Sequence, residues 1–177
     1  MFALPHKNIE YLNLLPGMKV ADFGAGTGAY AYAAAESVTK DGQVIVIDIQ
    51  KDLLEKIARE ALENNISNIK TLWGDIEVKG GVKLADRLVD AVIVSNVLFQ
   101  TDSKYGVALE AKRILKPDGK VLLVDWQDSY GGLGPDPDHV FTEAQAEEVF
   151  KEAGFVVDNR FNAGDHHYGL VFKLASR

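Results

Sequence analysis

The stretch that decides the fold is Val20-Ala21-Asp22-Phe23-Gly24-Ala25-Gly26-Thr27-Gly28. It is an apolar run that breaks into three glycines at alternate positions, directly before the alanine-rich stretch 29–38. Glycine has no Cβ atom, so such a loop can adopt positive φ angles and let a bulky polar molecule approach the backbone N–H groups at a helix N-terminus. The stretch therefore predicts a strand, a ligand-binding turn and a helix.

A second apolar run, 44–47, ends at Asp48, twenty residues after Gly28. An acidic residue at the end of a second strand can accept hydrogen bonds from the ribose hydroxyls of a nucleoside cofactor. Gly24, Gly26 and Ala29 also satisfy the relaxed dinucleotide fingerprint. These features alone leave open which nucleoside cofactor binds.

Length and composition predict one domain, 1–177, because 177 residues of which 47% are hydrophobic can build one core around a sheet. The net charge of −7 argues against a nucleic-acid partner, so a small molecule is the expected partner. The sequence has no cysteine, which excludes disulfides, thiolate metal sites and thiol nucleophiles. No apolar segment approaches the roughly 20 residues of a membrane span. The N-terminus lacks a signal-peptide pattern, and we expect a cytoplasmic protein.

Short runs rich in Val, Ile and Leu predict strands that are covered on both faces, at 20–23, 44–48, 69–73, 89–95 and 121–126. Helices are expected at 29–38, at 52–65 and from about 102 to 115, with 116–119 as a strong stop before the fifth strand. The last helix begins at Thr142, which forms a capping-box pattern with Gln145, and Gly154 suits its C-terminal cap. Two further strands, 155–160 and 168–174, are joined by 162–165 as a hairpin.

The predicted order is β-α-β-α-β-α-β-α-β-α followed by a β-β pair. It indicates an α/β fold: a three-layer αβα sandwich whose mostly parallel seven-stranded sheet ends in an antiparallel β-hairpin. Ligands bind such sheets at the carboxyl ends of the strands. The glycine loop 24–28, Asp48 and the polar residues after Trp73 and Val94 all lie at those ends.

From about Leu14 to Leu174 the chain resembles the class I S-adenosylmethionine-dependent methyltransferases. The loop 20–28 is similar to the family's glycine loop, which contacts the methionine part of the cofactor. Asp48 with Ile49 resembles the residues that bind the ribose and border the adenine, and Gly74-Asp75-Ile76 resembles the adenine site. The segment 89–98 resembles the family's fourth strand with the edge of the active site. The segment 115–123 is similar to the stretch that precedes and forms the fifth strand. The resemblance implies that the cofactor S-adenosyl-L-methionine, released as S-adenosyl-L-homocysteine, is bound by Asp22, Gly24, Ala25, Gly26, Thr27, Gly28, Asp48, Ile49, Gly74, Asp75, Ile76, Ser95, Asn96 and Leu98. The resemblance also implies that Asp22 orders the glycine loop and interacts with the amino group of the cofactor.

The implied activity is methyl transfer to an oxygen, nitrogen or carbon of a small-molecule acceptor. The alternatives are an NAD-binding Rossmann module, a cofactor-binding protein without catalysis, and a protein methyltransferase. The NAD reading gives no role to Gly74-Asp75-Ile76 or to the terminal strand pair, and the chain lacks the length for a dehydrogenase's second region.

Two absences narrow the acceptor. Ser95-Asn96-Val97-Leu98 does not match the Asp/Asn-Pro-Pro-aromatic tetrad of enzymes that methylate exocyclic amino groups of nucleobases. The segment after the fourth strand also lacks the acidic pair with which the catechol-type relatives hold magnesium, so no metal is expected.

The long connection 125–139 leaves the fifth strand on the ligand side. We expect Trp126 and Tyr130 to line the acceptor pocket, with Asp125, Gln127 or Asp128 as polar contacts. The alternative is a surface linker on which Trp126 merely packs.

Residues 1–17 predict a short helical segment over the edge of the site. His6 in this segment and Tyr130 are the candidate catalytic residues, His6 as a general base or else a solvent-facing histidine. His166 and His167 invite a metal reading, but adjacent residues in extended chain point to opposite faces and no third ligand is evident, which favours structural or surface roles over metal binding. The sequence leaves the acceptor, the oligomeric state and the mobility of the loop around Tyr130 open.

Overall fold

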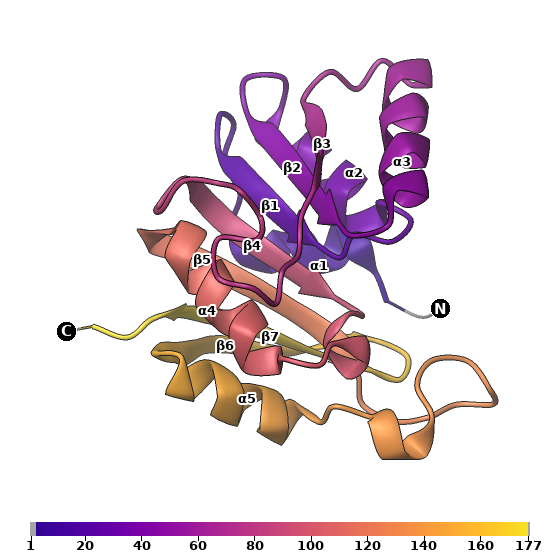
Figure 1. Ribbon diagram of the computed structural model, residues 1–177, viewed down its shortest axis with the longest axis vertical. Helices are drawn as coiled ribbons and strands as arrows, with labels where there is room; N and C mark the ends of the chain where they lie inside the picture. The colour runs from indigo at the N-terminus through magenta and orange to yellow at the C-terminus, as the bar shows by residue number, and fades with distance from the viewer. Residues whose placement is uncertain (1–2, 177) are drawn as a thin grey trace.

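Seven strands form one sheet in the computed structural model, which describes residues 3–176 (Figure 1). The strands lie in the order β3-β2-β1-β4-β5-β7-β6. Their bounds are β1 (Lys19–Phe23), β2 (Gln43–Asp48), β3 (Ile69–Trp73), β4 (Val89–Ser95), β5 (Leu115–Trp126), β6 (Phe155–Gly164) and β7 (His167–Leu174). Strands β1 to β5 pair in parallel, and β7 is antiparallel to both β5 and β6. The predicted mostly parallel sheet with a terminal hairpin is confirmed.

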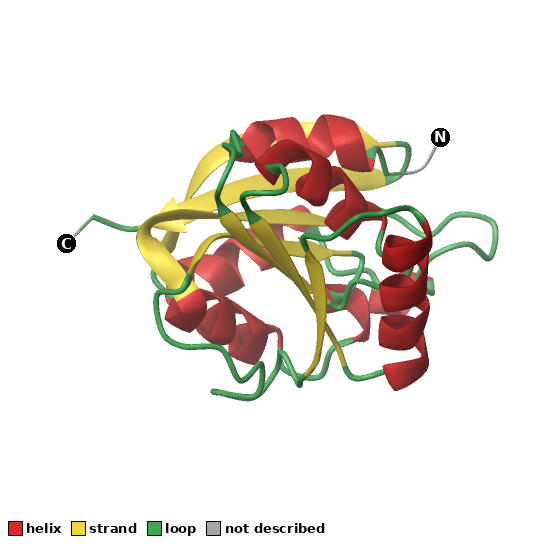
Figure 2. Cartoon of the chain, turned by 90° about the horizontal axis from the view of Figure 1, so that it is seen from above, coloured by secondary structure: helices red, strands yellow, loops and turns green. Residues whose placement is uncertain are grey.

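Helices cover both faces of the sheet, which makes the three layers that the sequence predicts (Figure 2). One face packs against α1 (Pro5–Ile9), α2 (Ala29–Val38) and α3 (Lys51–Glu63), and the other against α4 (Lys104–Ile114) and α5 (Glu143–Glu152). Short 3₁₀ turns lie at Glu10–Leu12, Leu98–Gln100 and Pro137–His139. Among residues 3–176, no helix has the length and apolar character needed to cross a bilayer.

The side chains of each strand alternate between two cores, as the twofold period of a strand requires. Along β2, for example, Val44 and Val46 pack toward α2, whereas Ile45 and Ile47 pack toward the opposite layer. The buried alanines of α2 let that helix lie close to the sheet beside the glycine loop. Packing against both cores therefore fixes the positions of the carboxyl ends of β1, β2 and β4 relative to one another.

The helix caps follow the sequence. Thr142 and Gln145 form the capping box of α5 in both directions, and Gly154 follows the end of α5 with φ +95°. The hydroxyl of Ser103 accepts a hydrogen bond from the N–H of Gly106 at 3.1 Å and caps α4.

The sequence predicts a helix between the third and fourth strands, and this prediction is wrong. Residues 74–88, all of which the structure describes, contain turns and no helix. A Cβ atom on Gly81 would lie 2.2 Å from the carbonyl oxygen of Asp75, so this loop folds back on itself more tightly than a side chain at that position allows. Ile76 and Val82 fill the core from the loop, in the layer where a helix was expected.

Two predicted boundaries also move. Strand β5 already begins at Leu115, which pairs with Val89, and 116–119 form a bulge before Lys120 pairs with Ala91. A bulge tolerates Pro117, which has no N–H to donate. The hairpin is confirmed, but β6 continues to Gly164, and only Asp165 and His166 separate it from β7. His166 has φ +62°, so a two-residue turn places His167 at the first position of β7.

Candidate active site

A groove runs along the carboxyl ends of β1, β2, β4 and β5 and consists of two cavities that share Gly24, Gly26 and Gln100. The large cavity, of about 470 Å³, lies between the glycine loop, the N-terminal segment and the end of β5; its lining includes Ala3, Pro5, Asp22, Ala25, Thr27, Ala29, Tyr30, Ser95, Asn96, Trp126, Leu133, Gly134 and His167. The small cavity, of about 220 Å³, is lined by Asp48, Ile49, Gln50, Gly74, Asp75, Ile76, Glu77, Val97 and Thr101. The large cavity falls within the range of about 300–1,000 Å³ that is usual for small-molecule clefts, and the small cavity extends it.

The glycine loop forms the wall between the two cavities. Gly24, Gly26 and Gly28 all have positive φ, at +63°, +52° and +81°. A Cβ atom on Gly24 would lie 2.5 Å from Cγ2 of Val97, whereas a Cβ atom on Gly26 would meet nothing within 4 Å. Gly24 is therefore needed for close packing, and Gly26 keeps the backbone open toward the groove.

Asp22, the last residue but one of β1, lies beneath this loop and is 1% exposed. Burial and the neighbouring charge of Asp48 raise its pKa to about 7, against a hydrogen bond from the backbone of Ala31 that lowers it. Its Oδ2 atom has no hydrogen-bond partner among the described residues. A buried carboxylate oxygen at a cavity wall fits a cationic group of a ligand, because such a group would remove the cost of the unpaired atom.

Asp48 and the segment 74–76 lie around the small cavity, as the sequence predicts. Oδ1 of Asp48 accepts a hydrogen bond from the N–H of Gln50 at 2.8 Å, and Oδ1 of Asp75 accepts one from the N–H of Glu77 at 2.9 Å. Ile49 is 61% exposed at the rim. The pair of carboxylates, an apolar rim and backbone groups fit the ribose and base of a nucleoside.

Glu110 of α4 holds the loop 74–88 in place. Its carboxylate accepts hydrogen bonds from the N–H groups of Gly80 (2.9 Å) and Val82 (3.2 Å) and from both Nε and Nη2 of Arg113. Burial raises the pKa of Glu110, but the hydrogen bonds from Arg113 and the backbone outweigh burial and lower it. The carboxylate therefore stays ionised, and it fixes the loop that carries Gly74-Asp75-Ile76.

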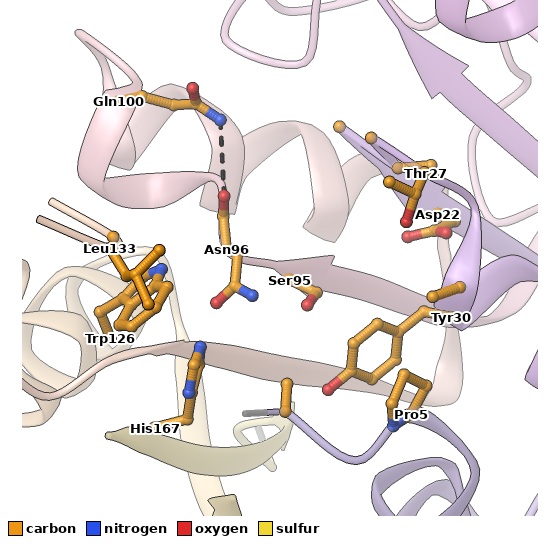
Figure 3. Close-up of a pocket in the computed structure, with 16 residues that line it drawn as sticks. Pro5, Asp22, Thr27, Tyr30, Ser95, Asn96, Gln100, Trp126, Leu133 and His167 are labelled. Atoms are coloured by element: carbon orange, nitrogen blue, oxygen red, sulfur yellow. Dashed lines mark hydrogen bonds between the residues drawn. The ribbon is translucent and has the colours of Figure 1, made fainter. Parts of the chain in front are cut away.

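Polar groups also line the floor of the large cavity (Figure 3). The hydroxyl oxygen of Tyr30 accepts a hydrogen bond from Nδ2 of Asn8 at 2.8 Å. Burial raises the pKa of Tyr30 to about 12, in spite of hydrogen bonds from Asn8 and Ser95 that lower it, so the hydroxyl stays neutral. Asn96 has φ +52°, and its buried Oδ1 atom has no partner among residues 3–176.

Trp126, Leu133 and His167 form the opposite wall (Figure 3). The rings of Trp126 and His167 lie 4.3 Å apart. Gly134 lies against the indole so closely that a Cβ atom there would be 2.6 Å from the ring. The connection after β5 thus folds back over Trp126, which lies in the cavity wall as the sequence predicts.

The other predicted acceptor-site residues lie outside both cavity linings. Tyr130 is 49% exposed and stacks on His166 with a ring separation of 4.1 Å. Nδ1 of His166 is 2.7 Å from Oδ1 of Asp128. Gln127 is exposed, and His6 lies 3.6 Å from Glu36 on the surface.

Three buried residues that the sequence predicts near the ligand, Leu98, Asp125 and Gly28, lie beneath the groove and outside its lining. Leu98 is fully buried and donates its N–H to Oδ2 of Asp125 at 3.0 Å. Burial raises the pKa of Asp125 to about 7, while hydrogen bonds from the backbone of Trp126, Leu98 and Phe99 lower it. Gly28 is the left-handed residue before α2. Asp125 therefore orders the turn after β4 and does not line the groove.

Several residues that line the cavities were not predicted from the sequence. Tyr30 could have been found, because it is the second residue of the helix after the glycine loop. His167, Gly134 and Pro5 could not, because they come from distant segments that only the fold brings together. Among the described residues, no group of three His, Asp or Glu side chains could hold a metal ion.

This sheet order, with a groove at the strand tips that pairs a glycine loop with an acidic residue, defines a Rossmann-like nucleoside-binding protein. Residues 14–156 match the family described as "Methyltransferase domain". The chain therefore belongs to this family, and its fold is that of the class I S-adenosylmethionine-dependent methyltransferases.

The relatives agree with this assignment. The chain is 31% identical to an arsenite methyltransferase of Halobacterium salinarum, over 63% of this chain and 28% of that protein. It is 30% identical to the ubiquinone/menaquinone biosynthesis C-methyltransferase UbiE of Haemophilus ducreyi, over 67% of this chain and 45% of that protein. It thus spans less than half the length of these two curated relatives. The fold matches the crystal structure of a SAM-dependent methyltransferase from Aquifex aeolicus with a TM-score of 0.87, at 23% identity, over 97% of this chain and 89% of that one.

Proposed function

We propose that the chain binds S-adenosyl-L-methionine along the whole groove and transfers its methyl group to an oxygen, nitrogen or carbon of a small-molecule acceptor, with S-adenosyl-L-homocysteine as product. The small cavity takes the adenosine, with Asp48 at the ribose and Gly74-Asp75-Ile76 at the base. The large cavity takes the methionine part and the acceptor. The bound cofactor supplies an electrophilic methyl group, and the chain supplies the alignment.

The observation that carries this proposal is the buried Oδ2 atom of Asp22 at the wall beside Gly24 and Gly26. An amino acid ammonium would pair with this atom. A dinucleotide would instead place its pyrophosphate at this loop, where a buried carboxyl group offers an anion no favourable charge. The site thus favours a cationic amino acid nucleoside over NAD.

The residues of the large cavity narrow the acceptor. Trp126, Leu133 and Pro5 provide apolar surface, and Tyr30, Ser95 and Asn96 provide polar groups. The sequence has no cysteine to supply the thiolate ligands that a thiophilic arsenic centre prefers, which argues against arsenite as acceptor. A small organic molecule with an apolar ring or chain and one or two polar groups fits best. The cytoplasmic location remains a prediction from sequence.

Calorimetric titration with S-adenosyl-L-homocysteine and, separately, with NAD tests the proposal. We expect binding of the first only, and a loss of affinity of about tenfold or more when Asp22→Asn removes the charge that pairs with the ammonium. The exposed Asp41→Asn variant is the matched control and should keep wild-type affinity. Binding of NAD without binding of the homocysteine nucleoside would refute the assignment.

A further inference from the structure

His167 lies in the wall of the large cavity, across from the glycine loop (Figure 3). It is 1% exposed and is the first residue of β7, where it pairs with Trp126 of β5. Its ring rises from β7 toward Asn96 and lies beside the indole of Trp126 (Figure 3). The imidazole is therefore held by a strand and an aromatic neighbour at the place where an acceptor would lie.

The hydrogen bond at Nδ1 decides which tautomer is present. Nδ1 of His167 lies 2.7 Å from the carbonyl oxygen of Asp165. A carbonyl oxygen can only accept a hydrogen bond, so Nδ1 must carry the proton. In a neutral imidazole the lone pair is then on Nε2.

The surroundings keep this imidazole neutral. Burial lowers the pKa of His167, and the charge of His166 lowers it further, whereas the carbonyl of Asp165 and the charges of Asp128 and Asp165 raise it. The other titratable groups of the cavity are Tyr30 on α2 and Asp22 on β1, and Trp126 on β5 brings no charge. The net direction is downward from the ordinary value of 6.5, so neutral pH favours the neutral imidazole, whose lone pair is on Nε2.

We propose that Nε2 of His167 is the general base of the methyl transfer, and that the acceptor carries a neutral O–H or N–H group, as in an alcohol, a phenol or an N–H heterocycle. This inference rests on the proposed methyl-transfer function. Tyr30 complements the base: its hydroxyl oxygen already accepts from Asn8, so its own hydrogen is available for a polar atom of the acceptor.

The bonds balance without a further reactant. The O–H or N–H bond of the acceptor breaks, its proton goes to Nε2, and its electron pair stays on the acceptor atom. That atom uses an electron pair to form the bond to the methyl carbon, and the pair of the sulfur–methyl bond returns to sulfur. The imidazolium then releases its proton to solvent when product leaves.

Two probes with the same ring separate base catalysis from positioning. Phenol must lose a proton, whereas 4-nitrothiophenol is already ionised at neutral pH and needs no base. With S-adenosyl-L-methionine carrying a labelled methyl group, His167→Asn should slow methylation of phenol by about 10²- to 10⁴-fold. It should leave methylation of 4-nitrothiophenol and the affinity for S-adenosyl-L-homocysteine within about threefold. His167→Gln should behave alike.

The pH profile gives a second readout. In the wild type, kcat/KM for phenol should fall on the acid side as His167 becomes protonated, and this limb should vanish in His167→Asn. The control is His166→Asn, which changes the adjacent histidine outside the cavity and suits its positive φ. It should keep both the rate and the acid limb.

A measurement on the unmodified protein needs no variant activity. Long-range ¹H–¹⁵N NMR of the imidazole should report a proton on Nδ1 and none on Nε2, with a pKa below 6.5. A proton on Nε2 would overturn the proposal, as would equal phenol turnover in His167→Asn. Failure to methylate phenol while S-adenosyl-L-homocysteine binds would overturn the acceptor class alone. Failure of S-adenosyl-L-homocysteine to bind the wild type would instead refute the proposed function.

Discussion

Asp22 and Asp48 lie on the adjacent parallel strands β1 and β2, and the charge of Asp48 raises the pKa of Asp22. Burial is the larger cause of the same shift, which brings Asp22 from 3.8 to about 7. The protein therefore holds one acidic group at the threshold of ionisation at neutral pH, directly beneath the glycine loop.

The first prediction concerns stability against pH. The folded carboxyl of Asp22 keeps a proton that the unfolded chain loses above about pH 4, so stability should fall as pH rises from about 4 to about 7. Asp22→Asn removes this loss and should raise the free energy of unfolding on the order of a few kcal/mol more at about pH 8.5 than at about pH 5. Urea unfolding at both values measures it. A gain independent of pH, or the same gain in Asp41→Asn, would contradict the pKa assignment.

The second prediction concerns the ribose side. Asp48→Ala should weaken binding of S-adenosyl-L-homocysteine by about 1–3 kcal/mol, because partner hydroxyls lose a charged acceptor. Calorimetry measures the change. Asp52, exposed in the first turn of α3, is the control, since Asp52→Ala removes a carboxylate four residues away without touching the groove. Unchanged affinity in Asp48→Ala would remove Asp48 from the ribose site.

The third prediction separates backbone strain from ligand contact. Gly26 and Gly17 both have positive φ, at +52° and +87°, and a Cβ atom at either would meet nothing within 4 Å. Alanine at either position should therefore lower the free energy of unfolding by about 1–2 kcal/mol, which is the cost of a left-handed backbone for a residue with a Cβ atom. Only Gly26→Ala places a methyl group in the groove, so only it should weaken nucleoside binding. Equal affinities in the two variants would place the ligand elsewhere.

The fourth prediction concerns the loop 74–88. Glu110→Gln replaces one acceptor oxygen by an N–H₂ group that faces donors, which should destabilise the protein by about 1–3 kcal/mol. The amides of Gly80 and Val82 should exchange with deuterium faster, and nucleoside affinity should fall with them. Glu152→Gln, on the exposed side of α5, is the control. Protection of Gly80 and Val82 that survives the change would show that the loop does not depend on Glu110.

The strands and the cofactor side could be predicted because their signals are local. The structure has β3 and β4 with the predicted bounds, and Asp22, Gly24, Asp48 and 74–76 line the groove. Each of these residues lies at the end of an apolar run or directly after one, so the adjacent sequence predicts its place at a strand end.

The acceptor side could not be predicted, because it depends on contacts between distant segments. Tyr130 was expected in the pocket, yet it stacks on His166, while Trp126 nearby does line the cavity. His167 reaches the cavity only because the hairpin turn has two residues; the longer predicted turn placed it before the strand. The helix predicted between β3 and β4 is absent for the same reason, because the loop 74–88 that replaces it depends on a distant segment. Glu110 and Arg113 of α4 hold this loop.

The division of the groove at Gly24 and Gly26 has a consequence for the choice of acceptor. The small cavity is built from the tips of the first four strands, whereas the large cavity combines the glycine loop and the end of β4 with the N-terminal segment, the connection after β5 and the start of β7. Under the proposed function, substitutions in the last three segments would change which acceptor is bound and leave the nucleoside site intact. In that arrangement, three short segments outside the first four strands set the acceptor, and the sheet itself need not change.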